Sequence, residues 1–216
     1  MEAGGPFLKP AAFRGQLCFG PSEGRYVRFT SPRRWLGEWD EPDPEKALRE
    51  VTRRYLAAHS PATREDYARW WGGASPAGAQ RLIEGLGDEV VEVEVEGSRS
   101  WMPAESLDEA RAASPSRSVR LLPGFDHWVI AASREPGAML DEAFRKRVYR
   151  SQGWISPVLL VSGRMEGVWR HERKGRRLEV SIEPFGKLPK WARSAAEEEA
   201  GLLASFLGGE LELSWG

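Results

Sequence analysis

The sequence predicts an α+β fold that combines a complete winged helix, a partial one at the amino end, and a small antiparallel β-barrel or meander with a carboxyl-terminal helix. Three short helical segments precede a strict alternation of valine and glutamate over 91–96. Beyond residue 118, apolar or alternating runs are separated by turn residues, and an amphipathic segment covers 189–207. A change from helical periodicity to period-two alternation indicates a change from helices to strands.

The amino-terminal segment, residues 1–40, is predicted to be the carboxyl-terminal half of a winged helix with a linker. The end of a helix is expected over 6–13, and two strands are expected on either side of the turn residues 20–25. Such a half-domain cannot close a hydrophobic core by itself. We therefore expect it to pack on its neighbours, on a partner chain, or on a second copy in a homodimer.

A linker is predicted over 31–45, which is rich in proline and acidic residues. Its large apolar side chains Trp35, Leu36 and Trp39 are expected to dock against the protein, because such side chains seldom remain in water without a reason.

Residues 41–104 are predicted to form the complete winged helix. Thr63 occupies the expected N-cap position of the second helix, and Ser75 occupies that of the third. The alternation over 91–96 and the return through 100–102 are expected to form the wing hairpin. Winged helices usually serve duplex DNA, which makes this segment informative about function.

Residues 105–117 are predicted to be a linker with a short helix, and 118–216 to be the β-barrel-like domain. The strands of this domain are expected at 119–123, 128–131, 155–161, 165–171, 178–183 and 211–215. The amphipathic helix over 189–207 is expected to cover one open end of the sheet.

Composition excludes several classes of protein. The 216 residues are 41% hydrophobic, as in a globular protein, and no apolar run is long enough to cross a membrane. The single cysteine, Cys18, excludes an internal disulfide framework, so we expect a cytoplasmic protein that joins the nucleoid when it binds DNA. One cysteine and three scattered histidines have no metal-ligand spacing, so we expect neither a metal nor another cofactor.

The formal net charge of −1 conceals an uneven distribution of charge along the chain. Acidic residues dominate 88–109, whereas arginine and lysine dominate 145–177 and the amino end. This asymmetry is consistent with one surface that faces phosphates and another that faces solvent. A solvated, arginine-rich surface explains the same pattern equally well.

The best local candidate for contact with double-stranded DNA is the predicted hairpin around Gly175, where cations at a tight turn could grip both sides of a groove. The alternative is a solvated turn whose charges prevent aggregation. Further cations lie over 145–150, on the first hairpin, and on the third helix of the winged helix. The candidate DNA-binding residues are Arg170, Arg173, Lys174, Arg176, Arg177, Arg145, Arg147, Arg150, Arg14, Arg25, Arg28 and Arg81.

Two other candidate sites have simpler interpretations. The third helix offers Gln80 and Arg81 to DNA bases, but Glu84 and nearby glycines are poor for reading them, so a scaffold role is favoured. Asp126 and His127 suggest acid–base chemistry. No nucleophile or second carboxylate accompanies them, so a turn cap is the favoured interpretation.

Several phrases of the sequence occur in an order that is typical of one family. FRGQLCFGPSEGRYVRF, RRYLAAHSPATREDYARWWG, VRLLPGFD, WISPVLLVSGRMEGVWR and EPFGKLP resemble the winged-helix DNA-binding proteins of the AlkZ/YcaQ-type DNA glycosylase family. The resemblance extends over nearly the whole chain. It implies tandem winged helices followed by a β-barrel, a concave basic surface for duplex DNA, and excision of alkylated or crosslinked purines.

In that family, catalysis is associated with a Gln-x-Gln or Gln-x-Asp motif in the first winged helix. The three glutamines of this chain, Gln16, Gln80 and Gln152, are followed two residues later by cysteine, leucine and tryptophan. The resemblance therefore implies that the first winged helix and much of the second are absent from this sequence. No residue is expected to inherit the catalytic role.

Several functions are compatible with these observations. The leading hypothesis is sequence-tolerant binding of duplex DNA without intrinsic catalysis. The alternative is an active DNA glycosylase that a missing amino-terminal region or a partner chain completes, so the sequence leaves enzymatic activity open. A protein–protein adaptor and a transcription regulator are further alternatives.

Overall fold

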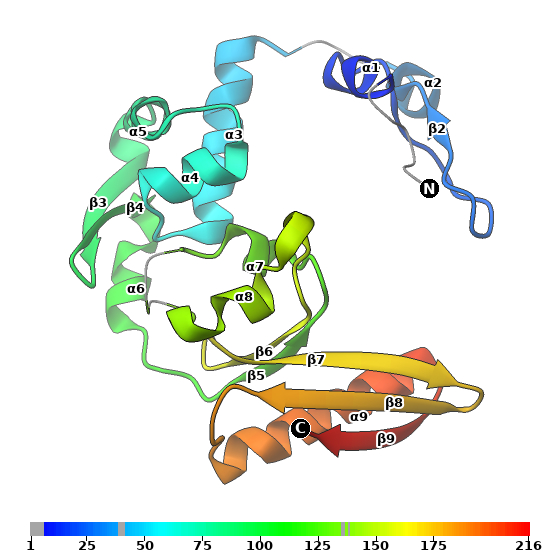
Figure 1. The fold of residues 1–216 in the computed structure, drawn as a ribbon. Helices are drawn as coiled ribbons and strands as arrows, with labels where there is room; N and C mark the ends of the chain where they lie inside the picture. Colours follow the sequence, from blue (N-terminus) through cyan, green and yellow to red (C-terminus); the bar gives the residue numbers. More distant parts are fainter. Residues whose placement is uncertain (1–6, 39–41, 135–136, 138) are drawn as a thin grey trace. The chain divides into compact units, whose positions relative to one another are not determined.

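The computed structural model describes residues 7–38, 42–134, 137 and 139–216. The chain divides into two compact units, Met1–Ala47 and Leu48–Gly216, and each is described by itself (Figure 1). Both helices and antiparallel strands are present, so the predicted α+β class is confirmed. Within the described residues, no helix combines the length and the apolar character that a membrane span requires.

The first unit contains two short helices, α1 (Lys9–Phe13) and α2 (Pro32–Leu36). Between them, β1 (Cys18–Phe19) pairs antiparallel with β2 (Phe29–Thr30), so a short helix and a hairpin are present where a helix end and a hairpin were predicted. Helix α2 lies within the predicted linker, and its first residue is a proline, whose fixed φ suits the first helical turn.

Two of the three linker side chains that were predicted to dock lie on the surface of the first unit, so their docking stays a prediction. Trp35 is 52% exposed and Leu36 is 63% exposed, while Trp39 lies outside the described residues. Among residues 7–38, only Pro32 is buried. A segment of this length offers too little apolar area for a core of its own.

The second unit begins within α3 (Pro44–His59), from Leu48 onward, and continues with α4 (Arg64–Trp71) and α5 (Pro76–Glu84). The predicted caps are confirmed. The Thr63 hydroxyl accepts a hydrogen bond from the Asp66 N–H, and the Ser75 hydroxyl accepts one from the Gly78 N–H. Gly72 ends α4 in the left-handed conformation that residues other than glycine rarely adopt.

A hairpin follows these helices, after a 3₁₀ turn at Gly87–Glu89. β3 (Val90–Val95) pairs antiparallel with β4 (Ser98–Pro103) around the two-residue turn at 96–97, where both φ angles are positive. Aromatic and aliphatic side chains from the helices and the hairpin form one core. Its buried members are Tyr55, Leu56, Ala62, Tyr67, Ala68, Ala79, Ile83, Leu86 and Trp101.

The connection to the large sheet contains a 3₁₀ turn at Ala104–Ser106 and α6 (Leu107–Ala112), where a short helix was predicted. The predicted strand over 128–131 is wrong, because these residues form α7 (His127–Ala131). The Asp126 carboxylate accepts a hydrogen bond from the Trp128 N–H and so starts the helix. Val129 is fully buried against Val148 and Val158, so tertiary packing overrides the strand preference of its branched side chain.

The last part of the unit is a five-stranded sheet of order β5-β6-β7-β8-β9. Its strands are β5 (Val119–Leu122), β6 (Val158–Val161), β7 (Arg164–Lys174), β8 (Arg177–Pro184) and β9 (Glu210–Trp215). The predicted antiparallel meander is present from β5 to β8, but the predictions of a barrel and of wholly antiparallel pairing are wrong. β5 and β9 are the two edges of an open sheet, and β9 pairs parallel with β8. The parallel pair arises because α9 (Lys190–Leu207) connects β8 to β9 as a crossover.

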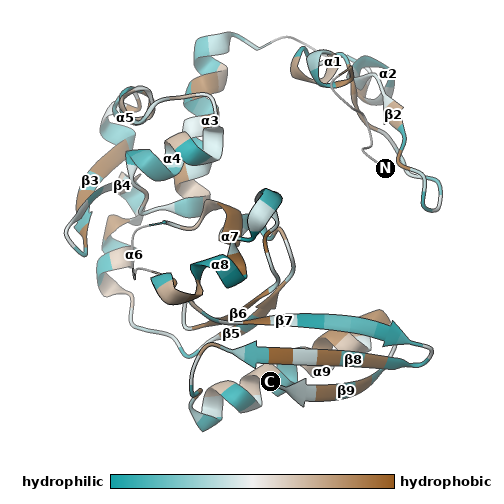
Figure 2. Cartoon of the chain, in the orientation of Figure 1, coloured by the Kyte–Doolittle hydropathy of each residue, from teal (hydrophilic) through white to brown (hydrophobic). Residues whose placement is uncertain are grey.

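Helix α9 covers one face of the sheet rather than an open end of a barrel. Its alanines at 192, 196, 200 and 204 repeat every four residues and are buried against Leu178, Val180 and Ile182. Figure 2 shows the corresponding alternation of apolar and polar residues along β8. Alanine at each of these positions lets the helix approach the sheet closely.

We expect Ala196→Leu to lower the free energy of unfolding by about 1–3 kcal/mol, because three added carbons have no space beneath the helix. Thermal unfolding followed by circular dichroism measures this effect. The matched control is Ser194→Leu, at an exposed position of the same helix. Equal melting temperatures of the two variants would contradict the close approach of α9.

Candidate nucleic-acid interface

The predicted basic hairpin is the connection between β7 and β8. Residues 170–177 are all exposed, and Figure 2 shows the outer half of β7 as hydrophilic. Lys174 lies opposite Arg177, and Arg170 lies opposite Ser181. The hairpin therefore presents its charged side chains to solvent at the end of the sheet.

Arg173 has a structural role within this hairpin. Its Nη1 donates to the Leu207 carbonyl at 2.8 Å, and its Nη2 donates to the Gly208 carbonyl at 3.1 Å. These carbonyls are at the end of α9, where helix carbonyls lack partners and attract cations. Arg173 therefore holds the end of α9 against the hairpin.

Most other cations of the hairpin have carboxylate neighbours. Lys174 lies 2.7 Å from Glu179, Arg177 lies 3.6 Å from Glu212, and Arg176 lies 4.0 Å from Glu210. Among the described residues, no hydrogen-bond or ion-pair partner is found for the side chain of Arg170. Exposed ion pairs of this kind contribute little stability, so phosphates can replace the carboxylates.

A second group of cations lies on and after α8 (Arg145–Val148). Arg145 lies 3.2 Å from Glu142, and Arg147 lies 2.6 Å from Glu183 and over the ring of Phe185. Arg150 is exposed, and the described part of the chain contains no acidic partner for it. The pair between Arg147 and Glu183 attaches this group to β8.

Members of both groups of cations lie at one face of the sheet. Side chains alternate along a strand, so Glu183, Ser181 and Arg177 project from the face of β8 opposite α9. Arg147 reaches this face through Glu183, and Arg170 projects from it beside Ser181. Six residues of extended chain separate Glu183 from Arg177, which corresponds to about 20 Å. We name this face the open sheet face. It carries carboxylates as well as cations.

The third helix and its hairpin offer few free polar groups. Arg81 is exposed on α5, but Gln80 accepts a hydrogen bond from Arg64 and donates one to Glu84. Arg99 on β4 pairs with Glu92 across the hairpin. The side chains of Gln80 and Arg99 are therefore engaged within the protein, which is consistent with the predicted scaffold role.

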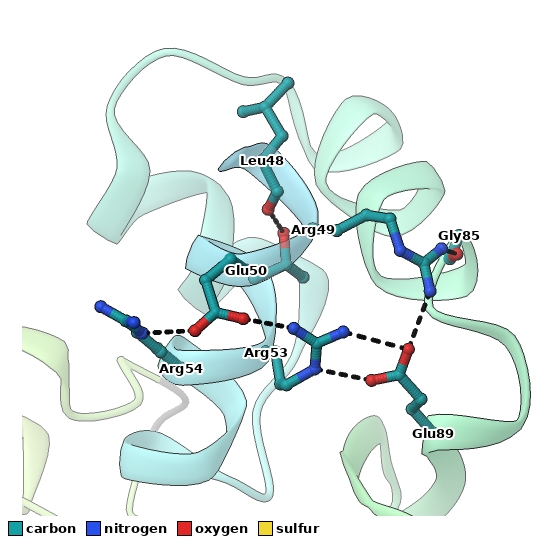
Figure 3. Close-up of polar contacts among 8 residues, drawn as sticks. Leu48, Arg49, Glu50, Arg53, Arg54, Gly85 and Glu89 are labelled. Carbon is teal, nitrogen blue, oxygen red and sulfur yellow. Dashed lines mark hydrogen bonds and ion pairs between the residues drawn. The ribbon is translucent and has the colours of Figure 1, made fainter. Parts of the chain in front are cut away.

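The arginines of α3 are similarly engaged. Figure 3 shows Arg53 between Glu50 and Glu89, with Arg54 also paired to Glu50. Arg49 donates to the Gly85 carbonyl and lies 2.8 Å from Glu89. This network joins α3 to the end of α5 and the turn before β3, so its arginines serve the fold.

The network also predicts sensitivity to acid. Hydrogen bonds, from Arg54 and Arg53 to Glu50 and from Arg53 to Glu89, lower the pKa of each carboxyl from its ordinary value. A lowered folded-state pKa contributes stability above the unfolded pKa of about 4.3, and this contribution is lost as the pH falls through the folded pKa.

At about pH 7, Glu89→Gln is expected to have a lower melting temperature than wild type. As the pH is lowered from about 7 to about 3, the melting temperature of wild type is expected to fall further than that of Glu89→Gln. Melting curves across this range test the prediction, with Glu109→Gln, on exposed α6, as the control. A pH profile of Glu89→Gln that matched wild type would show that the network does not contribute.

Two arginines that the sequence analysis missed lie where the helices meet the rest of the second unit. Arg69 donates to Asp66 at 2.8 Å and to the Ala132 carbonyl at 2.9 Å. The guanidinium of Arg134 lies 3.3 Å from the centre of the Tyr149 ring. Burial, together with nearby Arg69 and Arg145, lowers the pKa of Arg134. Asp66 and Arg69 are three residues apart, a spacing that indicates an ion pair within a helix, so the sequence could have predicted this contact. No feature of the sequence indicated a role for Arg134.

The remaining candidates belong to the first unit. Arg28 pairs with Glu23 across the small hairpin, and Arg25 lies over the ring of Tyr26 at 5.5 Å. Arg14 follows the end of α1 and is exposed.

Neither of the other chemical possibilities is supported by geometry. Asp126 has the predicted role of a cap, but it caps the helix α7 rather than a turn. Across residues 7–38, 42–134, 137 and 139–216, no group of three histidine, cysteine or acidic side chains is placed to hold a metal ion.

Comparisons with known proteins identify close relatives. A family described as DNA glycosylase AlkZ-like matches residues 2–206. An interstrand DNA cross-link repair glycosylase of Streptomyces sahachiroi is 35% identical over 208 residues, covering 94% of this chain and 55% of the relative. The solved structure of the Streptomyces sahachiroi DNA glycosylase AlkZ matches with a TM-score of 0.80 and 35% identity, covering 95% of this chain and 56% of that structure. The chain thus spans about half the length of these relatives.

Proposed function

The chain belongs to the DNA glycosylase AlkZ-like family, and we propose that it binds double-stranded DNA in the repair of damaged bases. The observation that carries this proposal is the likeness, in sequence and fold, to a glycosylase that repairs interstrand cross-links. The resemblance inferred from the sequence is thereby confirmed at the level of the family.

We assign the segment 41–104 to a winged helix and 118–216 to a sheet domain that supports DNA contact. The order of three helices and a hairpin supports the first assignment. We propose that the open sheet face and α8 contact phosphates through Arg145, Arg147, Arg150, Arg170, Lys174, Arg176 and Arg177. Arg81 and the arginines at 14, 25 and 28 are additional proposed contacts. Arg173 is omitted because α9 engages it. The proposed location is the cytoplasm and, with DNA bound, the nucleoid.

Duplex binding is tested by fluorescence anisotropy over a series of salt concentrations. The logarithm of affinity should fall linearly with the logarithm of salt, by about 0.9 per phosphate contact. Arg170→Ala with Arg176→Ala should reduce the slope by about 1.8. Arg173→Ala should lower the melting temperature instead. No binding at low salt by the folded protein would refute the proposal, and an unchanged slope in the double variant would exclude the hairpin.

A second candidate function is base excision, which the name of the relative suggests. An N7-alkylated purine is already cationic, so an enzyme needs mainly to position water and stabilise the developing positive charge on the sugar. We propose that this chain alone does not catalyse that step, since none of its glutamines forms the family motif. Incubation with DNA that contains N7-methylguanine decides the question, because released base would establish intrinsic activity.

We further propose that the first unit associates with other protein, either a partner chain or a second copy of this chain. Several of its large apolar side chains are exposed, including Phe7 at 89%, Phe13 at 87% and Phe19 at 67%. Surfaces of this kind are typical of interfaces. Light scattering after gel filtration should report a dimer if the partner is a second copy, whereas a monodisperse monomer would exclude the homodimer.

A further inference from the structure

Two neighbouring loops of the second unit carry a pair of exposed aromatic rings. Phe125 follows β5 and is 44% exposed, and Trp154 precedes β6 and is 57% exposed. Their ring centroids are 5.2 Å apart with an interplanar angle of 53°. These two large rings contact each other but remain exposed to water, so they do not serve the hydrophobic core. We name the pair Phe125 and Trp154 the aromatic platform.

The loop of Phe125 is held in an unusual backbone conformation. The Asp126 N–H donates to the Pro123 carbonyl, which closes a turn, and φ of Phe125 is +59°. Phenylalanine adopts such a φ reluctantly, whereas glycine adopts it freely. The preceding Gly124 lies so close to the second loop that a Cβ there would be 3.2 Å from the Ile155 carbonyl. The close approach of Gly124 places the first loop directly against the second.

The loop of Trp154 is equally constrained. Tyr149 forms a β-bridge with Ile155, and the Arg150 N–H donates to the Trp154 carbonyl at 2.8 Å. Two consecutive residues at the tip, Gln152 and Gly153, have φ of +60° and +76°. Strained conformations that neighbouring structure maintains are frequent at binding sites.

The charge around the two rings favours an anionic partner. Arg150 is exposed between α8 and Trp154, and the segment 143–161 contains four cations and no acidic residue. The carboxylate of Asp126 caps α7 and is the one acidic side chain of the loop segments 123–126 and 150–155. Aromatic faces beside arginine are the combination that binds unstacked nucleobases together with their phosphates.

We propose that Phe125 and Trp154 stack on a nucleobase that has left the base stack of bound duplex DNA, while Arg150 contacts the adjacent phosphate. The proposal rests on the proposed function, since it requires duplex binding. It adds a preference for a site in the duplex where stacking is already interrupted.

The test compares two duplexes of the same sequence, one fully paired and one with a 2-aminopurine opposite an abasic-site analogue. Wild type should bind the interrupted duplex roughly fivefold to a hundredfold more tightly, and the 2-aminopurine fluorescence should be quenched. Trp154→Ala and Phe125→Gly should abolish the preference and the quenching. Phe125→Gly keeps the turn intact, because glycine suits φ of +59°.

Two controls separate stacking from general effects. Trp154→Phe retains an aromatic face and should keep most of the preference. Phe206→Ala removes a more accessible ring, 88% exposed on α9, and should change nothing. If the folded chain bound both duplexes equally, or if Trp154→Ala kept the preference, the aromatic platform would be refuted while duplex binding stood. Failure to bind either duplex would overturn both proposals.

Discussion

Replacing Arg145, Arg147 and Arg150 together by alanine is expected to weaken binding to duplex DNA by roughly two to three orders of magnitude near 0.1 M salt. Each lost phosphate contact removes about 0.9 from the slope of log affinity against log salt, so the slope should fall by about 2.7. Arg150 has no acidic partner among the described residues, and the partners of the other two are exposed. Phosphates can therefore displace those partners at little cost.

The matched control removes the same charge elsewhere. Arg54, Arg99 and Arg111 each lie beside a carboxylate. Arg99 lies within the acidic stretch 88–109, and Arg111 follows it closely. Their triple alanine variant should bind DNA with nearly the wild-type salt slope. Equal losses in the two variants would mean that net charge, rather than the cations on and after α8, determines affinity.

Asp66→Ala is expected to lower the free energy of unfolding by about 2–3 kcal/mol. The carboxylate is buried and accepts hydrogen bonds from the Thr63 hydroxyl at 2.8 Å and from Arg69 at 2.8 Å. Arg69 in turn donates to the Ala132 carbonyl at 2.9 Å, so loss of Asp66 weakens both the start of α4 and its attachment to α7. Solvent reduces the contribution of the ion pair to stability, because the Arg69 side chain is 32% exposed.

Urea unfolding of the variant measures this loss, and Glu65→Ala is the control. Glu65 is the preceding residue, but its carboxylate is exposed and pairs only with exposed Arg64 among the described residues. The control should change stability by less than about 0.5 kcal/mol. Comparable losses in the two variants would contradict the role of the buried cap.

Much of the fold could be predicted from the sequence, because it depends on interactions between residues close together in the chain. Thr63, Ser75 and Asp126 act on backbone groups two or three residues away, so the residues alone predict these caps. The strand predicted at 128–131 failed because burial of Val129 outweighs its local preference. The parallel pairing of β9 depends on where α9 crosses the sheet, which no local pattern encodes.

Less of the candidate interface could be predicted from the sequence. Charge composition identified the cations of the β7–β8 hairpin, but the role of Arg173 at the end of α9 depends on a contact between residues 34 positions apart. Phe125 and Trp154 were not predicted as a site, because their contact depends on the approach of two loops. Positive φ angles at residues other than glycine leave no sequence pattern, so this signal became visible only in the structure.

Hydrogen exchange of the chain with and without saturating duplex DNA tests the central claim most directly. We expect DNA to slow exchange in 123–126, 145–154 and 170–177, which contain the aromatic platform, α8 and the β7–β8 hairpin. The acidic segment 88–109 should exchange at the same rate in both samples. Protection of the acidic segment alone, or exchange that DNA leaves unchanged throughout, would contradict the proposed interface.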